Sequence, residues 1–581
     1  MISKIHSVLF VLAIGSASLA MTACKPVKSC SASNCNGCCS EMGQCLAGNG
    51  NTACGRGGSL CKACGLNEMC LATTGSCIGG MGAGAGGGVS GTGGGTSSTG
   101  GGTSGTGGGM TGGGSGGSGG GAINPDDVEG TCTQSWSSDL DGGARPCPFG
   151  ASPPTAMVIS EDGGVLTISS AVRGDGSFTL ANVPMGPYFV KVGSTWLKTA
   201  ERRISLSFES LGRVDGAMAG ASTTLTVNAT GMTAWDRQNH FMSLYSSNAG
   251  ISMEAFNLST ASMPSGGETS YNFAIPWELY STQLGTPMLD STKGDSAIVT
   301  QMGADQTGEY RILGAATAAS VAMVSGQANT TTAALTIPPS SNTPLDVNLA
   351  SFSAAATDFT VGTEASLAVE FNTGPKALHE RGADGLAFVW GWYPQAGVPS
   401  TLPNPVSYPN PFPSTWGTTV VVQYGNGVSR LAPGAFEARR YFSGVSMTMP
   451  IQALASPVTS TLSPPKDVQL NGMPFSSAQM TVTRTPTLAW AAPSVGTPTR
   501  YLLRIEQLQV SQSRTTGRVA AVFYLLPTDT TFTVPPNVLL TGQSYVFVLS
   551  SLRSPGNLTR DLYDFRFPIA SGAVVSGIVR P

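Results

Sequence analysis

The chain has 581 residues, of which only 11% are charged, and its 30 Lys and Arg against 33 Asp and Glu give a net charge of −3. Soluble domains usually contain about 25% charged residues, and a nucleic-acid-binding face needs more clustered cations than this chain offers. The composition therefore argues against a nucleic-acid partner, and at roughly 100–200 residues per domain the length indicates several domains.

The first residues predict export. Residues 8–20 form an apolar run that is too short to span a membrane as a helix and suits the hydrophobic part of a signal peptide. Residues 21–24, which end in Cys24, resemble the lipobox of bacterial lipoproteins, a family in which this Cys is acylated and becomes the mature N-terminus. The resemblance implies a signal peptide over 1–23 and lipidation of Cys24; cleavage by an ordinary signal peptidase is the alternative. The expected location is the outer membrane or cell surface of a Gram-negative bacterium, with the lipid on Cys24 as the membrane contact.

Ten of the 13 cysteines lie between residues 30 and 77, so we assign 24–78 as a small disulfide-rich module. The few large apolar side chains between them cannot form a core, and cross-links must replace it. Two CxxC pairs also fit a zinc ribbon, but exported chains oxidise their thiols. Without the lipid-carrying cysteine an even number remains, which can pair completely. The disulfide candidates are Cys30, Cys35, Cys38, Cys39, Cys45, Cys54, Cys61, Cys64, Cys70, Cys77, Cys132 and Cys147.

Residues 79–123 are predicted to be a disordered Gly/Ser/Thr linker. Glycine occupies 26 of the 43 positions from 79 to 121. Such a segment cannot bury enough surface to offset its chain entropy, so it behaves as a flexible spacer with a mean span of roughly 35 Å.

Residues 124–581 are predicted to be all-β, as tandem β-sandwich domains. Apolar and polar residues alternate in 165–168, 205–208 and 224–228, and turn-forming pairs recur about every ten residues. Many short strands at this spacing are typical of sandwiches and barrels.

The stretch 174–192 opens with an Asp-Gly turn, after which alternation points Phe178, Leu180 and Val183 inward. The stretch resembles the carboxypeptidase regulatory-like domain, a transthyretin-like β-sandwich. We therefore assign 124–230 to such a module. The resemblance implies a structural or binding role without catalytic residues.

The C-terminal region 456–581 has a second resemblance. Trp490 and Tyr501 lie on consecutive predicted strands, and residues 540–545 combine Leu, Gly and Tyr545 before another strand. This pattern resembles fibronectin type III. The resemblance implies that Tyr545 is a tyrosine-corner residue whose hydroxyl bonds to upstream backbone.

Residues 231–455 resemble no family that we recognise, and are predicted to form a β-rich domain. They contain a cluster of aromatic residues for which two interpretations are open. The rings are candidates for stacking on sugars, or they pack in the core of a sandwich. The candidate stacking residues are Trp390, Trp392, Tyr393 and Trp416.

Signals for catalysis are sparse, and we predict no catalytic residue, metal or cofactor. Beyond the signal segment the chain has two histidines, His240 and His379, and neither has a metal-binding spacing. His240 lies near Asp236 and Ser243, which keeps a Ser-His-Asp arrangement open. Acidic candidates for glycosidase-type chemistry are Asp290, Asp295 and Glu309.

The sequence thus predicts a non-enzymatic, lipid-anchored cell-surface protein that presents β-sandwich modules for binding or adhesion. The expected partner is a polysaccharide, the matrix or another surface or envelope protein, contacted through backbone, hydroxyl and aromatic groups because charge is scarce. The alternatives are a secreted hydrolase with its catalytic domain in 231–455, and a structural envelope spacer.

Overall fold

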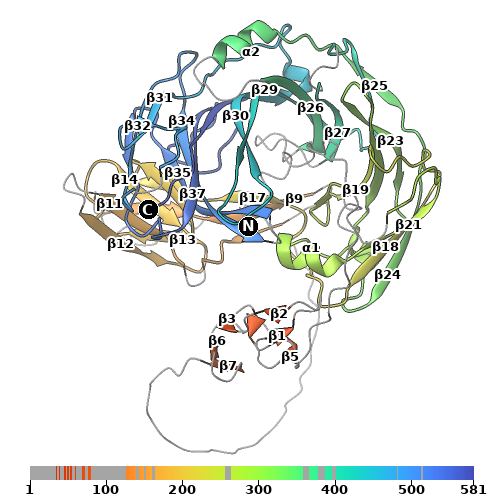
Figure 1. Ribbon diagram of the computed structural model, residues 1–581, viewed down its shortest axis with the longest axis horizontal. Coiled ribbons are helices and arrows are strands. Elements are labelled where there is room, and N and C mark those ends of the chain that lie inside the picture. The colour runs from red at the N-terminus through yellow and green to blue at the C-terminus, as the bar shows by residue number, and fades with distance from the viewer. Residues whose placement is uncertain are drawn as a thin grey trace, which may run out of the picture. The chain divides into compact units, whose positions relative to one another are not determined.

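The computed structural model describes short segments between residues 35 and 79 and most of residues 126–581. The chain divides into two compact units, formed chiefly by residues 6–118 and 119–581 (Figure 1). Within the second unit, the residues outside the description are 139, 141–142, 150–151, 160–163, 256–262, 357–364, 377–386, 395–400, 480–481 and 512–513. Several predictions fall outside the described residues: the signal peptide, Cys24, Cys30, Cys61, Cys64, the linker beyond Gly79, and His379.

The cysteine-rich unit contains short paired strands. The strand register places Cys39 of β1 opposite Cys45 of β2, and Cys70 of β6 opposite Cys77 of β7. Cys35 is disulfide-bonded and buried, as is Cys38. The strands are β1 Cys38–Cys39, β2 Cys45–Leu46, β3 Asn49–Gly50, β4 Ala53–Cys54, β5 Ser59–Leu60, β6 Glu68–Leu71 and β7 Ser76–Gly79.

The second unit begins with a region of three sheets, two of which form a sandwich. Its strands are β8 Val128–Thr131, β9 Thr133–Ser137, β10 Ala144–Pro146, β11 Thr155–Ile159, β12 Val165–Val172, β13 Ser177–Leu180, β14 Tyr188–Val192, β15 Thr195–Thr199, β16 Arg203–Ser205 and β17 Phe208–Leu211. Strand β12 belongs to both sheets, because its first half pairs with β11 and its last three residues pair with β13. Phe178, Leu180 and Val183 are completely buried, which confirms the inward positions expected from alternation.

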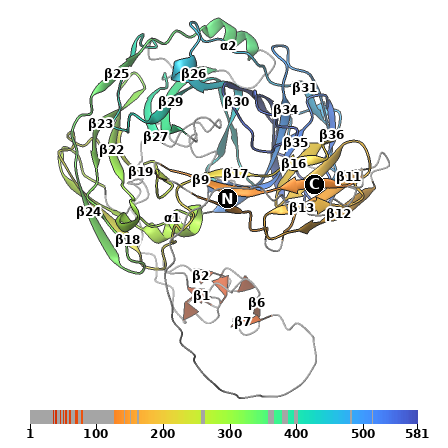
Figure 2. The same cartoon turned by 180° about the vertical axis from the view of Figure 1, so that it is seen from behind.

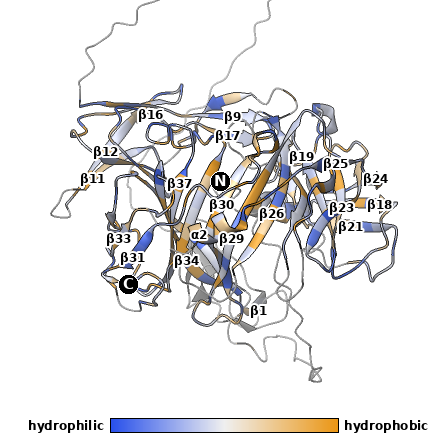
Figure 3. Ribbon diagram, turned by 90° about the horizontal axis from the view of Figure 1, so that it is seen from above, coloured by the Kyte–Doolittle hydropathy of each residue, from blue (hydrophilic) through white to orange (hydrophobic). Residues whose placement is uncertain are grey.

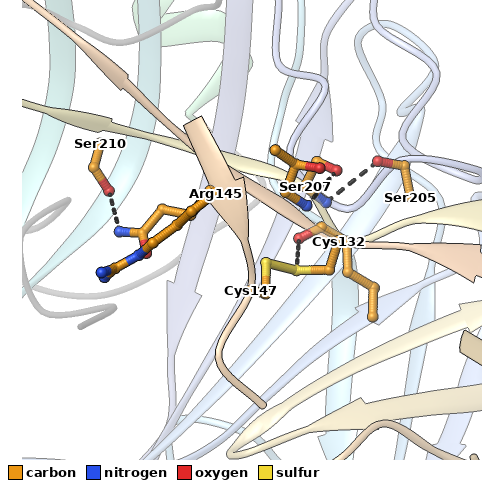
Figure 4. The surroundings of a disulfide bond; sticks show 9 residues. Cys132, Arg145, Cys147, Ser205, Ser207 and Ser210 are labelled. Atoms are coloured by element: carbon orange, nitrogen blue, oxygen red, sulfur yellow. Dashed lines mark hydrogen bonds between the residues drawn. A yellow bond between two sulfur atoms is a disulfide. The ribbon is translucent and has the colours of Figure 1, made fainter. Parts of the chain in front are cut away.

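Two of the disulfide candidates, Cys132 and Cys147, are bonded to each other (Figure 4). Their Cα atoms lie 5.4 Å apart, and the Cys132 sulfur lies 3.2 Å from the Leu206 carbonyl oxygen. The cross-link therefore fastens β10 and the chain after it to the edge of the sandwich core, of which Leu206 is part.

The next sandwich packs a three-stranded sheet of β21, β18 and β24 against β19, β20, β22 and β23. Its elements are β18 Thr224–Thr230, β19 His240–Ser246, β20 Ile251–Met253, β21 Tyr271–Ile275, α1 Trp277–Leu284, the 3₁₀ turn η3 Ser291–Lys293, β22 Ile298–Ala304, β23 Glu309–Thr317 and β24 Ala328–Ala334. Strand β18 thus pairs with strands that follow residue 231.

Strand β19 lies between two cores. Its residues Met242 and Leu244 point into the core shared with β18, whereas Phe241 and Tyr245 point into the core of the region that follows. Consecutive strand residues point to opposite faces, so burial of both sets means that β19 has protein on both sides.

The following region surrounds the second of these cores. Its elements are β25 Ser340–Thr343, α2 Leu349–Ala355, β26 Ser366–Pro375, β27 Ala387–Trp392, β28 Val406–Pro409, β29 Trp416–Arg430, β30 Arg439–Pro450 and the 3₁₀ turn η4 Ile451–Ala453. In Figure 3, β26 and β29 combine hydrophobic and hydrophilic stretches, whereas all six residues of β27 are buried. Near-continuous apolar strands of this kind are expected where both faces of a sheet are covered.

The C-terminal sandwich packs the sheet of β31, β32, β33 and β36 against β34, β35, β37 and β38. Trp490 and Tyr501 are in its core with ring centroids 5.3 Å apart. The Tyr545 hydroxyl accepts a 2.8 Å hydrogen bond from the Leu540 backbone N–H, as expected for a tyrosine corner. The strands are β31 Lys466–Leu470, β32 Met473–Pro474, β33 Thr487–Ala491, β34 Arg500–Ser511, β35 Arg514–Leu525, β36 Thr531–Thr533, β37 Ser544–Arg553 and β38 Ile569–Val575.

The all-β prediction is confirmed, and the sandwiches are joined. Nineteen of the described strands form one hydrogen-bonded path from β20 to β16 (Figures 1 and 2). Two strand pairings connect neighbouring regions along this path: β30 pairs with β38, and β35 pairs in parallel with β15. Phe189 and Trp196 of the first sandwich also pack in the core of the C-terminal one. No helix among the described residues is long and apolar enough to cross a membrane.

Candidate binding face

The aromatic cluster singled out in the sequence lies in the core. Trp390, Trp392 and Trp416 are 0%, 6% and 9% exposed, and Tyr393 packs against the same cluster. The Trp390 indole N–H donates a 2.8 Å hydrogen bond to a Glu309 carboxylate oxygen. Burial raises the pKa of Tyr393 well above its usual value. The three tryptophan rings therefore present no open face for stacking on a sugar, and Tyr393 is only partly exposed.

His240 has a structural environment. Its Nδ1 accepts a 3.0 Å hydrogen bond from the Asp236 backbone N–H and lies 3.2 Å from the Gln301 side-chain amide. Burial lowers the pKa of His240, which favours the neutral ring that this acceptor role needs. The Asp236 carboxylate instead accepts from the backbone N–H of Gln238. The described contacts thus bring no Asp carboxylate to His240 in the manner of a catalytic triad.

The acidic candidates also have structural partners. Asp295, whose side chain is fully buried, accepts two hydrogen bonds of 3.0 and 2.9 Å from the Arg213 guanidinium. The Asp290 side chain accepts a hydrogen bond from the Thr292 N–H and caps η3. Among the residues that the structure describes, no group of three or more His, Cys, Asp and Glu side chains is arranged to hold a metal ion.

A different surface combines exposure with hydrogen-bonding groups: the outer face of the β21–β18–β24 sheet. In all three strands residues alternate between buried and more exposed positions, and Figure 1 shows the strands side by side. We call the set of outward residues the threonine face. Its members are Thr224, Thr226, Asn228, Thr230, Asn272, Ala274, Ala328, Thr330, Thr332 and Ala334.

The register places these residues in rows across the sheet. Thr226 is opposite Thr330 on one side and Ala274 on the other, and Asn228 lies between Thr332 and Asn272. Neighbouring strands are about 4.8 Å apart, and alternate residues of one strand are separated by roughly 6.7 Å. The face is therefore a regular grid of hydroxyls, amides and methyl groups.

The threonine face has no charge, and its side chains make no hydrogen bond to another described residue. Each hydroxyl and each amide can both donate and accept. Because the β-branched Thr side chain is stiff at χ1, fixing it against a ligand costs little entropy. The chemistry suits an uncharged ligand that is itself rich in hydroxyl groups.

A cleft of about 260 Å³ lies beyond the end of β24. No charged side chain is among the residues that line it, which are Ile298, Ala315, Ala316, Thr317, Thr336, Pro338, Pro339 and Pro411. Thr336 follows β24 by two residues, so the uncharged character of the threonine face continues into this cleft.

Sequence reasoning identified part of this face without recognising it. The alternation in 224–228 predicted the strand that became β18, but β24 lies about a hundred positions further along the chain. Ala328–Ala334 offered little signal, because its polar residues Asn and Thr stand at consecutive positions and only the burial alternates along the strand.

Comparisons with known proteins do not assign the chain to a family. No protein-family model matches it, and no curated protein matches it. Among solved structures, the crystal structure of chicken CNTN1 FN1–FN3 domains is 9% identical, with a TM-score of 0.13 over 59% of this chain and 89% of that one. Native E. coli alpha-2-macroglobulin is 10% identical, with a TM-score of 0.12 over 74% of this chain and 27% of that one. Similarities this low support no argument about function.

Proposed function

We propose that this chain is an exported, lipid-anchored, non-enzymatic surface protein that binds a neutral polysaccharide. The observation that carries the proposal is the threonine face, because it offers many hydrogen-bonding groups without charge. The low charge of the whole chain fits the same kind of contact. The proposed anchor is the lipid on Cys24, and the location is the outer membrane or cell surface of a Gram-negative bacterium.

The joined architecture supports a presenting role. Strand pairing and shared cores link the sandwiches. Binding of a ligand to one sheet therefore costs little conformational entropy in the protein. In this proposal the linker predicted for 79–123 supplies the reach, and a tethered body binds at raised effective concentration wherever that reach suffices. The resemblances of 124–230 and 456–581 to non-catalytic modules favour the same function.

Binding is tested with the full chain carrying Cys24→Ser, which removes the proposed lipid, against a panel of neutral polysaccharides. The decisive variant combines Thr226→Val, Thr330→Val and Thr332→Val. Valine keeps the shape and strand preference of threonine but has no hydroxyl. Since a hydrogen bond contributes about 0.5–1.5 kcal/mol, we expect affinity to fall at least about tenfold.

The matched control is Thr167→Val, an exposed threonine on β12 outside the threonine face. It should bind like the parent chain. Unchanged binding in the triple variant would remove the threonine face from the proposal. A parent chain that binds no polysaccharide would instead favour a structural envelope spacer.

The location is tested by membrane fractionation and protease shaving of intact cells that express the wild-type chain or Cys24→Ser. A membrane-bound, protease-sensitive wild type and a released variant are the expected results. A wild type that is protected from protease would place the body in the periplasm. If Cys24→Ser leaves the fractionation unchanged, the lipid anchor is wrong.

A further inference from the structure

Strand β12 of the first sandwich has a side that pairs with no other described strand. Its first five residues, 165–169, pair with β11, and its last three pair with β13. Among the described residues, no further backbone group bonds to 165–169. Strands β11 and β12 lie at the outer margin of this sandwich in Figures 1 and 2. We call residues 165–169 the open edge.

The open edge is exposed and uncharged. No residue of β12 is buried, whereas every other described strand of eight or more residues contains buried positions. The side chain of Leu166 is 51% exposed. The strand reads VLTISSAV and contains no charged residue, proline or glycine. Its backbone and its side chains are therefore both accessible to another strand.

Proteins usually protect the outer strands of their sheets with charged side chains, with proline or by keeping these strands short. Other outer strands of this chain follow that rule. Strand β10 contains Arg145 and Pro146, and β32 has only two residues and ends in Pro474. The open edge has none of these features, and its β-branched residues favour strand pairing. It is therefore suited to accept a further strand, a common mode of protein recognition.

The residues of the open edge are complementary to themselves. Antiparallel pairing of two copies about a two-fold axis at Thr167 places Leu166 of one copy opposite Ile168 of the other. The same register places Val165 opposite Ser169. Apolar cross-strand pairs stabilise a sheet, and no like charges meet in this arrangement. A two-fold contact of one patch with itself is the commonest form of protein dimer.

The sequence on either side of the open edge favours the same occupant. Along the chain, Glu161 and Asp162 precede the open edge, and Arg173 follows it. Antiparallel pairing of two copies directs ends of opposite charge toward each other, whereas parallel pairing directs ends of like charge toward each other. Charge complementarity thus supports a second copy in the antiparallel orientation.

We infer that two copies of this chain form a two-fold dimer by antiparallel pairing of their open edges. A strand pair of this length buries less than the roughly 1,000 Å² expected of a stable interface. The association is therefore weak in solution and increases with local concentration. The contact is separate from the threonine face and does not depend on polysaccharide binding.

The test traps the dimer with a disulfide in the full chain carrying Cys24→Ser and Thr167→Cys. Residues directly opposite each other in an antiparallel sheet have Cα atoms about 4.5–5.5 Å apart, within the range that a disulfide spans. The matched control is Ser169→Cys, because Ser169 is also exposed. In the proposed register its two copies are about 14 Å apart. Under mild oxidation Thr167→Cys should form a covalent dimer at least about tenfold faster than Ser169→Cys.

A second pair of variants tests the pairing itself. Leu166→Lys, added to Thr167→Cys, places a charge on the open edge and should lower the rate of dimer formation at least about threefold. Val324→Lys changes a side chain that is 49% exposed outside the open edge and should leave the rate unchanged.

Equal cross-linking of Thr167→Cys and Ser169→Cys would show random collision and overturn the inference. A rate that Leu166→Lys leaves unchanged would also overturn it. Cross-linking of Thr167→Cys in cells to other proteins, without a dimer of the purified chain, would replace the second copy with a foreign strand. None of these results bears on binding of neutral polysaccharides.

Discussion

Replacing Glu506 with alanine should destabilise the junction between β30 and the C-terminal sandwich. The Glu506 side chain is only 2% exposed. Its Oε2 lies 2.9 Å from the Arg439 Nε and accepts a 3.0 Å hydrogen bond from the Tyr441 hydroxyl, and its Oε1 pairs with Arg504. One carboxylate therefore contacts two guanidinium groups that are 22% and 17% exposed.

The magnitude follows from what remains after the substitution. Removing one partner of a buried ion pair costs about 3–5 kcal/mol, because the other charge stays buried without compensation. Here two like charges remain, and Arg439 already acts with burial to lower the pKa of Arg504. We expect Glu506→Ala to lower the opening free energy of this junction by about 3–5 kcal/mol. Glu506→Gln should cost less, since its amide oxygen still accepts hydrogen bonds.

Native-state hydrogen exchange is the appropriate assay, because a multidomain chain need not unfold in one step. The readout is the opening free energy of amides in β30 and β34. The control is Glu437→Ala, which breaks the ion pair between Glu437 and Arg514. These two side chains are 60% and 68% exposed. Exposed pairs contribute about 0–1 kcal/mol. If the two substitutions change exchange equally, the argument from burial is wrong.

Three further predictions concern single features. Replacing Cys132 and Cys147 with serine should lower the free energy of unfolding by about 3 kcal/mol, the chain-entropy value for a loop of this length. An unchanged melting temperature would contradict this prediction. Burial lowers the pKa of His240 below the usual 6.5; the unfolded chain then binds more protons, so this contribution is complete above pH 6.5 and is lost as pH falls. His240→Gln should flatten the stability profile over that range, and an unchanged slope would refute the assignment. Trp390→Ala should lower the unfolding free energy by about 3–5 kcal/mol without weakening polysaccharide binding, and the reverse pattern in paired stability and binding assays would restore a ligand-stacking role.

Local patterns predicted which residues point inward but not which strands pair. Alternation placed Phe178 and Leu180 in a core, and one motif placed the Tyr545 hydroxyl on upstream backbone, because both depend on residues that are close in sequence. The parallel pairing of β15 with β35 joins segments more than three hundred residues apart. A period of two determines the face of a strand and contains no information about its neighbour.

The candidate site was missed for the same reason. Dense aromatic residues satisfy the requirements of a buried core and of a sugar-binding platform equally, so Trp390 and Trp416 could be assigned only once the layers around them were known. The threonine face could be recognised only after the strand pairing was known. Its residues look unremarkable along the chain and become a continuous surface only when β18 and β24 are adjacent.

The junctions between the sandwiches determine how far the sandwiches can move relative to one another. An open β35 edge would be a site for unwanted strand pairing, and β15 covers it. Arg500, which is completely buried, donates to the backbone carbonyls of Lys198 at 2.7 Å, Tyr524 at 3.4 Å and Leu558. Burial lowers the pKa of Arg500 to about 10, so its position is costly and is offset by bonds that join three separate segments. A cut between these regions would expose that cation and the β35 edge together. We therefore expect the described β regions to act as one body, with the threonine face held in a fixed relation to the C-terminal sandwich.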